Sequence, residues 1–133
     1  MPFEKVGAVI LLVSDMNNSL KFYRDILGLP IKNQSQEWTE FFSSSTVLAI
    51  HPAKAKNRIR TEANMLVGFM VNDLDSTVKE LNEKNVKFFK KPKEEPFGKH
   101  AIIEDPDGHL ISIAQIDAKS TEGFDLLGLI GAE

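Results

Sequence analysis

The sequence contains no cysteine. Disulfide bonds, thiolate nucleophiles and cysteine-type zinc sites are therefore excluded, and a reducing compartment is favoured. The longest apolar run, residues 8–13, is far shorter than the roughly 20 residues that cross a bilayer, and no signal-peptide pattern is present. A basic excess is also missing, since the net charge is −3. We therefore expect a cytoplasmic protein that binds neither nucleic acid nor membrane.

What is present is typical of a globular protein of modest size. The chain has 133 residues, of which 42% are hydrophobic and 26% charged. This composition is close to the average of folded domains and far from that of disordered chains. The length suits a single domain.

Two segments of the chain follow the same plan, an apolar strand leading into an amphipathic helix. The strands are predicted at 6–13 and 65–71, and each is followed by an aspartate suited to capping a helix, Asp15 and Asp73. The two aspartates are 58 residues apart. The sequence therefore indicates an internal duplication.

Three short strand-like runs follow each predicted helix. They lie at 29–32, 38–42 and 47–51 in the first half and at 86–89, 100–104 and 110–115 in the second. The fold class is therefore predicted as α+β, with two tandem β-α-β-β-β modules at 1–62 and 63–116. Residues 117–133 are predicted to form a C-terminal segment that docks on its own sheet or on a second subunit.

Strand alternation assigns side chains to sheet faces in the first module. The connection 43–46 has an even number of residues, so Trp38 and Glu40 are expected on the same face as Ala49 and His51. The same reasoning gives an expectation for the second module.

In the second module, Asp-Pro-Asp-Gly at 105–108 has the pattern of a type I turn. A loop of these four residues places Ser112 opposite Ala101. His100 and His109 then lie on the face away from Ser112, and His109 is expected to end the hairpin.

Two strings carry a family resemblance. Val-Ser-Asp-Met-x-x-Ser-Leu-x-Phe-Tyr-x-x-x-Leu-Gly at 13–28 and Glu-Asp-Pro-Asp-Gly-His-Leu at 104–110, set in duplicated modules, resemble the vicinal oxygen chelate superfamily. This group includes glyoxalase I, bleomycin-resistance proteins and extradiol dioxygenases. The resemblance covers residues 4–116. It implies a curved mixed sheet with helices on the outer face, metal ligands on the inner strands, and pairing of subunits into a homodimer.

The metal that the resemblance implies is not expected in this chain. The four positions where the family places His, Gln or Glu ligands hold Ala8, Ala49, Leu66 and Ser112. Methyl and alkyl groups cannot coordinate a divalent ion. We therefore expect no metal and no cofactor.

The inner strands instead predict a largely apolar wall of the kind that binds small molecules. The candidate ligand-binding residues are Trp38, Glu40, Ala49, His51, Met70 and Ser112. The leading hypothesis is a protein of the bleomycin-resistance type that binds an apolar, aromatic or amphiphilic small molecule. No catalytic residue is assigned.

Three alternatives remain open. Glu40 and His51 would be solvated and without a role if they lay at an open rim, and Trp38 would fill an interface between modules or subunits. A lyase, isomerase or dioxygenase would use a relocated or non-metal centre with His51 and Glu40. A regulatory domain without a ligand would bind a partner through its C-terminal segment.

Overall fold

The computed structural model describes residues 6–44, 46–53, 65–96 and 98–116. The chain divides into two compact units, Met1–Arg60 (unit 1) and Thr61–Glu133 (unit 2). The predicted docking segment at 117–133 lies outside the described residues.

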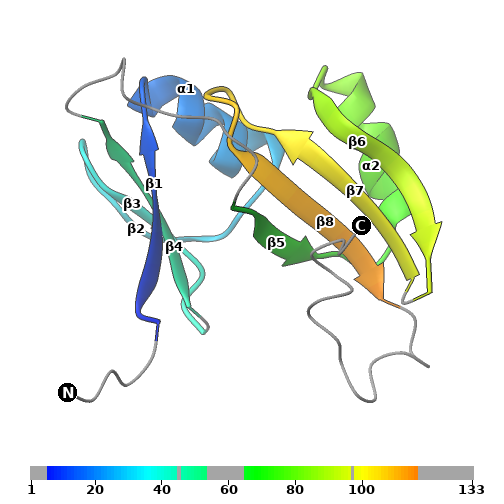
Figure 1. The fold of residues 1–133 in the computed structure, drawn as a ribbon. Coiled ribbons are helices and arrows are strands. Elements are labelled where there is room, and N and C mark those ends of the chain that lie inside the picture. Colours follow the sequence, from blue (N-terminus) through cyan, green and yellow to red (C-terminus); the bar gives the residue numbers. More distant parts are fainter. Residues whose placement is uncertain (1–5, 45, 54–64, 97, 117–133) are drawn as a thin grey trace. The chain divides into compact units, whose positions relative to one another are not determined.

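Each unit is one four-stranded mixed sheet with a helix beside it (Figure 1). Unit 1 contains β1 (Ala8–Val13), α1 (Met16–Leu20), the π-helix η1 (Lys21–Ile26), β2 (Ile31–Gln34), β3 (Thr39–Phe41) and β4 (Val47–Pro52). Unit 2 contains β5 (Val67–Met70), α2 (Leu74–Glu83), β6 (Phe88–Glu95), β7 (Gly98–Glu104) and β8 (Leu110–Ile116).

The two sheets have the same topology. The strand orders are β1-β4-β3-β2 and β5-β8-β7-β6. The first strand of each unit pairs in parallel with the last, and the other pairs are antiparallel. The predicted α+β class with two β-α-β-β-β modules is confirmed.

The helix of unit 1 begins where the sequence predicts. The Asp15 carboxylate accepts a hydrogen bond from the Asn18 backbone N–H at 3.1 Å, and Gly28 takes the left-handed φ of 70° that ends many helices. Tyr23 is fully buried and contacts the Phe41 ring, with centroids 6.1 Å apart. The helix therefore packs on the sheet face that carries Phe41.

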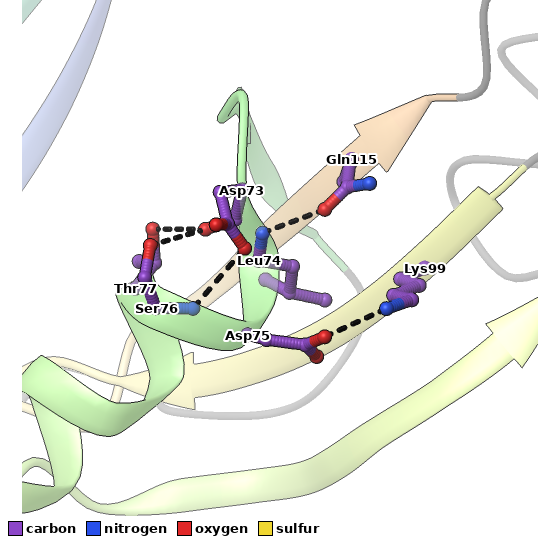
Figure 2. A network of polar contacts seen from close by, with 7 residues as sticks. All are labelled: Asp73, Leu74, Asp75, Ser76, Thr77, Lys99 and Gln115. Carbon is purple, nitrogen blue, oxygen red and sulfur yellow. Dashed lines mark hydrogen bonds and ion pairs between the residues drawn. The ribbon is translucent and has the colours of Figure 1, made fainter.

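The start of α2 is held by two acceptors (Figure 2). The Asp73 carboxylate accepts from the Ser76 backbone N–H at 3.2 Å. The Gln115 side-chain oxygen, from β8, accepts from the Leu74 backbone N–H at 2.7 Å. Leu74 and Leu81 are buried, so this helix is fixed by polar contacts at its first turn and by apolar packing along its length.

Some predicted boundaries are wrong. β6 extends to Glu95 and includes Pro92, because Pro is tolerated on an edge strand and β6 is last in its sheet's order. β3 ends at Phe41, since Phe42 adopts a left-handed φ of 69° and leaves the pleat. None of the helices in the described ranges has the length and apolarity needed to cross a membrane.

Candidate functional site

The sheet face of unit 1 that points away from its helix carries four of the predicted site residues. Strand pairing places Glu40 opposite Ala49, and Ala49 opposite Ile10 of β1. Asn33 of β2 lies on the other side of Glu40. One row of side chains therefore crosses all four strands, as the even-length turn predicts for Glu40 and Ala49.

Glu40 is the charged centre of this face. Its two carboxylate oxygens accept hydrogen bonds from Trp38 Nε1 at 2.7 Å and from Asn33 Nδ2 at 3.2 Å. These bonds, the one from Trp38 first, lower the pKa of the Glu40 carboxyl below its ordinary value. Lys32 Nζ lies 4.0 Å from the oxygen that accepts from Asn33. Glu40 is therefore ionised and oriented at neutral pH.

Trp38 and His51 form an aromatic pair beside Glu40. Their ring centroids are 6.0 Å apart in an edge-to-face arrangement, and both residues are half-buried. The His51 Nδ1–H donates to the Pro52 carbonyl at 2.7 Å, so in the neutral ring Nε2 is the nitrogen with a lone pair. Leu12 lies opposite His51 on β1 and extends this second row with an exposed apolar side chain.

The corresponding face of unit 2 carries Ser112 and Met70. Ser112 is paired with Gly68 on one side and with Ile102 on the other, and Met70 is opposite Ala114. Met70 is 61% exposed, whereas Ser112 is buried. A Cβ added at Gly68 would meet nothing within 4 Å, so the space beside Ser112 is open on the β5 side.

The prediction that His100 faces away from Ser112 is wrong. Asp105 N–H donates to the His109 carbonyl at 3.0 Å, so the loop between β7 and β8 has five residues. Ser112 is therefore opposite Ile102, one position away from the predicted partner Ala101. The expected turn is present at 105–108, but Gly108 has a φ of 86°, which adds a residue to the loop as in a glycine bulge. The glycine at the fourth turn position was the signal for this bulge.

The shift brings His100 and Ser112 to one face. His100 Nε2 and Ser112 Oγ are hydrogen-bonded at 2.6 Å, and both residues are buried. His109, at the end of the hairpin as predicted, bonds instead to Asp105. His100 is a buried polar residue that the sequence interpretation missed.

The residues present do not fit the metal centre that the resemblance implies. Ala8 and Ala49 lie on the strands where ligands would stand in unit 1, and neither has a donor atom. In unit 2 the positions hold Leu66 and Ser112, and the Ser112 hydroxyl is bonded to His100. Across the described part of the chain, no group of three or more His, Cys, Asp or Glu side chains is placed to hold an ion.

Comparison with known proteins agrees with this fold. The chain is 32% identical over 123 residues to "Uncharacterized protein YraH" of Bacillus subtilis (strain 168), an alignment that covers 82% of this chain and 96% of that protein. A protein of unknown function from Agrobacterium tumefaciens str. C58 has a similar structure, with a TM-score of 0.70, 26% identity, and coverage of 86% of this chain and 96% of that one.

A second solved structure is TnmS3, an antibiotic binding protein from Streptomyces sp. CB03234, with a TM-score of 0.68, 20% identity, and coverage of 88% and 99%. The sequence pattern of one family matches residues 5–113, nearly the whole of the two repeats. The chain therefore belongs to the Glyoxalase/Bleomycin resistance protein/Dioxygenase superfamily.

Proposed function

We propose that this protein binds a small apolar or aromatic molecule on its helix-free sheet faces, without the metal found in many members of its family. The predicted contacts are Trp38, Glu40, Ala49 and His51 in unit 1, and Met70 and Ser112 in unit 2.

The observation that carries this proposal is an exposed apolar surface beside an aromatic pair. Ile10 and Leu12 of β1 are 48% and 50% exposed, and Leu12 is in register with His51, whose ring contacts Trp38. An apolar surface with a few oriented polar groups is typical of small-molecule sites. The antibiotic-binding role named for TnmS3 supports binding as a use of this fold.

A second candidate is an enzyme with a non-metal or relocated centre. The observation that favours it is the tautomer of His51, since the bond to the Pro52 carbonyl leaves Nε2 able to accept a proton. Against it, Glu40 accepts its hydrogen bonds from Trp38 and Asn33, and His51 bonds to the Pro52 carbonyl, so Glu40 does not orient His51. Loss of a measured turnover in Glu40→Gln would favour the enzyme, and unchanged turnover would count against it.

The test of binding uses Trp38, the only tryptophan of the chain. We expect 2-naphthalenemethanol to change the emission of Trp38 saturably and to raise the melting temperature, because a ligand that binds only the folded state stabilises it. The variant Trp38→Phe keeps an aromatic ring and should lose the fluorescence signal. Absence of any saturable response to a panel of neutral aromatic compounds would contradict the proposal.

Metal titrations complete the test. Ni²⁺, Zn²⁺ and Mn²⁺ are expected to leave the melting temperature unchanged, because Ala8, Ala49 and Leu66 offer no donor atoms. Saturable binding of one ion per chain that survives Glu40→Ala and His51→Ala would overturn the metal-free assignment.

A further inference from the structure

We infer that Glu40 makes the binding face of unit 1 selective for organic cations. The ligand class is an apolar or aromatic body that carries a weakly hydrated positive group, such as a quaternary ammonium. This inference rests on the proposed function and adds the charge of the ligand to it.

The first argument is the state of the Glu40 carboxylate. Trp38 Nε1 and Asn33 Nδ2 each occupy one position on a different oxygen. An ionised carboxylate offers about four acceptor positions, so two bonds from neutral donors leave its negative charge only partly compensated and able to attract a cation. Hydrogen bonds from the protein also hold the carboxylate in one orientation, which reduces the entropy lost when a ligand binds.

The second argument is the partial burial of this charge. The Glu40 side chain is 21% exposed, so a ligand can reach it although much of its hydration is already lost. A charge in such a place attracts a counter-charge more strongly than one in open solvent does. Ile10 and Leu12 lie on β1, on the far side of β4 from Glu40. Both are exposed and apolar, so they add no charge to this face and suit an apolar ligand body.

The third argument is the aromatic ring next to the carboxylate. Trp38 donates its N–H to Glu40 along the ring edge, so this bond does not occupy the ring faces, whose negative potential attracts cations. Carboxylate and indole therefore favour the same sign of ligand charge. An anion would face repulsion from both.

Lys32 is the existing counter-charge. Its Nζ is 4.0 Å from a Glu40 oxygen, and its side chain is 40% exposed, so the pair is a weak surface ion pair with a long flexible cation. A ligand cation can replace it at low cost. Removing the lysine charge should therefore strengthen cation binding.

The experiment compares three probes of nearly the same shape: benzyltrimethylammonium, its neutral carbon analogue neopentylbenzene, and the anion phenylmethanesulfonate. Affinities are measured by Trp38 fluorescence and calorimetry at low salt. We expect the cation to bind about tenfold more tightly than the neutral analogue, which is the size expected for one partly desolvated charge contact. Added salt should reduce the difference in affinity between the cation and the neutral analogue, because salt screens the charge of Glu40.

Three variants test the role of each charge. In Glu40→Gln the side-chain oxygen can still accept from Trp38, so we expect the fold to be kept. The preference for the cation should disappear while neopentylbenzene still binds. Lys32→Gln should raise the affinity for the cation about threefold. The matched control is Glu37→Gln, which removes an exposed carboxylate from the same hairpin and should change the preference little.

The outcomes separate the two proposals. Equal binding of cation and neutral probe in the wild type, or tighter binding of the anion, overturns the cation inference and leaves the binding function standing. Absence of binding by all three probes overturns both. If circular dichroism shows that Glu40→Gln is misfolded, the comparison of the three probes on the wild type and on Lys32→Gln still tests the cation inference.

Discussion

Asp105 organises the turn between β7 and β8 with a single carboxylate. One of its oxygens accepts from the backbone N–H groups of Asp107 and His109, at 2.9 and 2.7 Å. The other lies 2.7 Å from His109 Nδ1. The hydrogen bond to Asp105 raises the pKa of His109 above 6.5, so the charged imidazole is favoured in the folded state.

This pair makes stability depend on pH. Because the pKa of His109 is higher in the folded than in the unfolded chain, its contribution is full below pH 6.5 and is lost as the pH rises through the folded value. We expect His109→Gln to lower the melting temperature more at pH 5.5 than at pH 8.5. Thermal unfolding of the wild type and of His109→Gln across this pH range measures the difference in melting temperature. The exposed-site variant Glu83→Gln should follow the wild type, and equal losses at both pH values would contradict the prediction.

Ser112 and His100 are coupled by a buried hydrogen bond of 2.6 Å. We expect Ser112→Ala to destabilise the protein by about 1–3 kcal/mol, because a buried imidazole nitrogen loses one partner. His100→Phe should also destabilise it, and the double variant should cost less than the sum by about 0.5–3 kcal/mol. Urea unfolding of the wild type, the two single variants and the double variant gives the coupling energy between Ser112 and His100. If the losses of stability in the single variants add up to the loss in the double variant, the contact contributes nothing.

At the scale of elements, Gln115 joins the last strand of unit 2 to the first turn of α2 (Figure 2). We expect Gln115→Ala to lower the free energy of unfolding by about 1 kcal/mol, because the Leu74 N–H loses its acceptor. Gln115→Glu should keep most of the stability, since it retains an acceptor oxygen and adds a negative charge at a helix N-terminus. Urea unfolding measures both, and equal losses in the two variants would contradict this role.

The helix boundaries were predictable because they depend on local chemistry. Asp15 and Asp73 cap their helices as expected, and Gly28 and Asn85 both have a left-handed φ. Within the first unit, Glu40 and Ala49 could be placed on one face because the turn between their strands keeps the alternation. Asn33 was missed because the strand was predicted at 29–32, whereas β2 runs over Ile31–Gln34.

The second unit shows why the rest of the site was not predictable. One left-handed residue, Gly108, changes which side chains of β7 face Ser112, and alternation then assigns every residue of the strand to the wrong face. His100 therefore came into the site through a feature of backbone conformation that residue counting does not contain.

For the whole molecule, the state of association remains a prediction. We expect a homodimer, as the family resemblance implies, with a mass near twice 14.9 kDa. β1 and β5 each end the strand order of their sheet, and exposed strand edges are usually covered in folded proteins. Light scattering over a range of concentrations measures the mass. A single species of monomer mass at every concentration would contradict the prediction.

The five-residue turn at 105–109 also bears on how this chain evolves. Deleting one codon there would turn β7 over, so that Ala101 and Ile103 replaced His100 and Ile102 beside Ser112. Lys99 would move to the same face, away from its ion-pair partner Asp75 of α2. Such a deletion would alter chemistry and burial in a single step, without any amino-acid exchange. The length of this loop therefore decides which side chains of β7 lie beside Ser112.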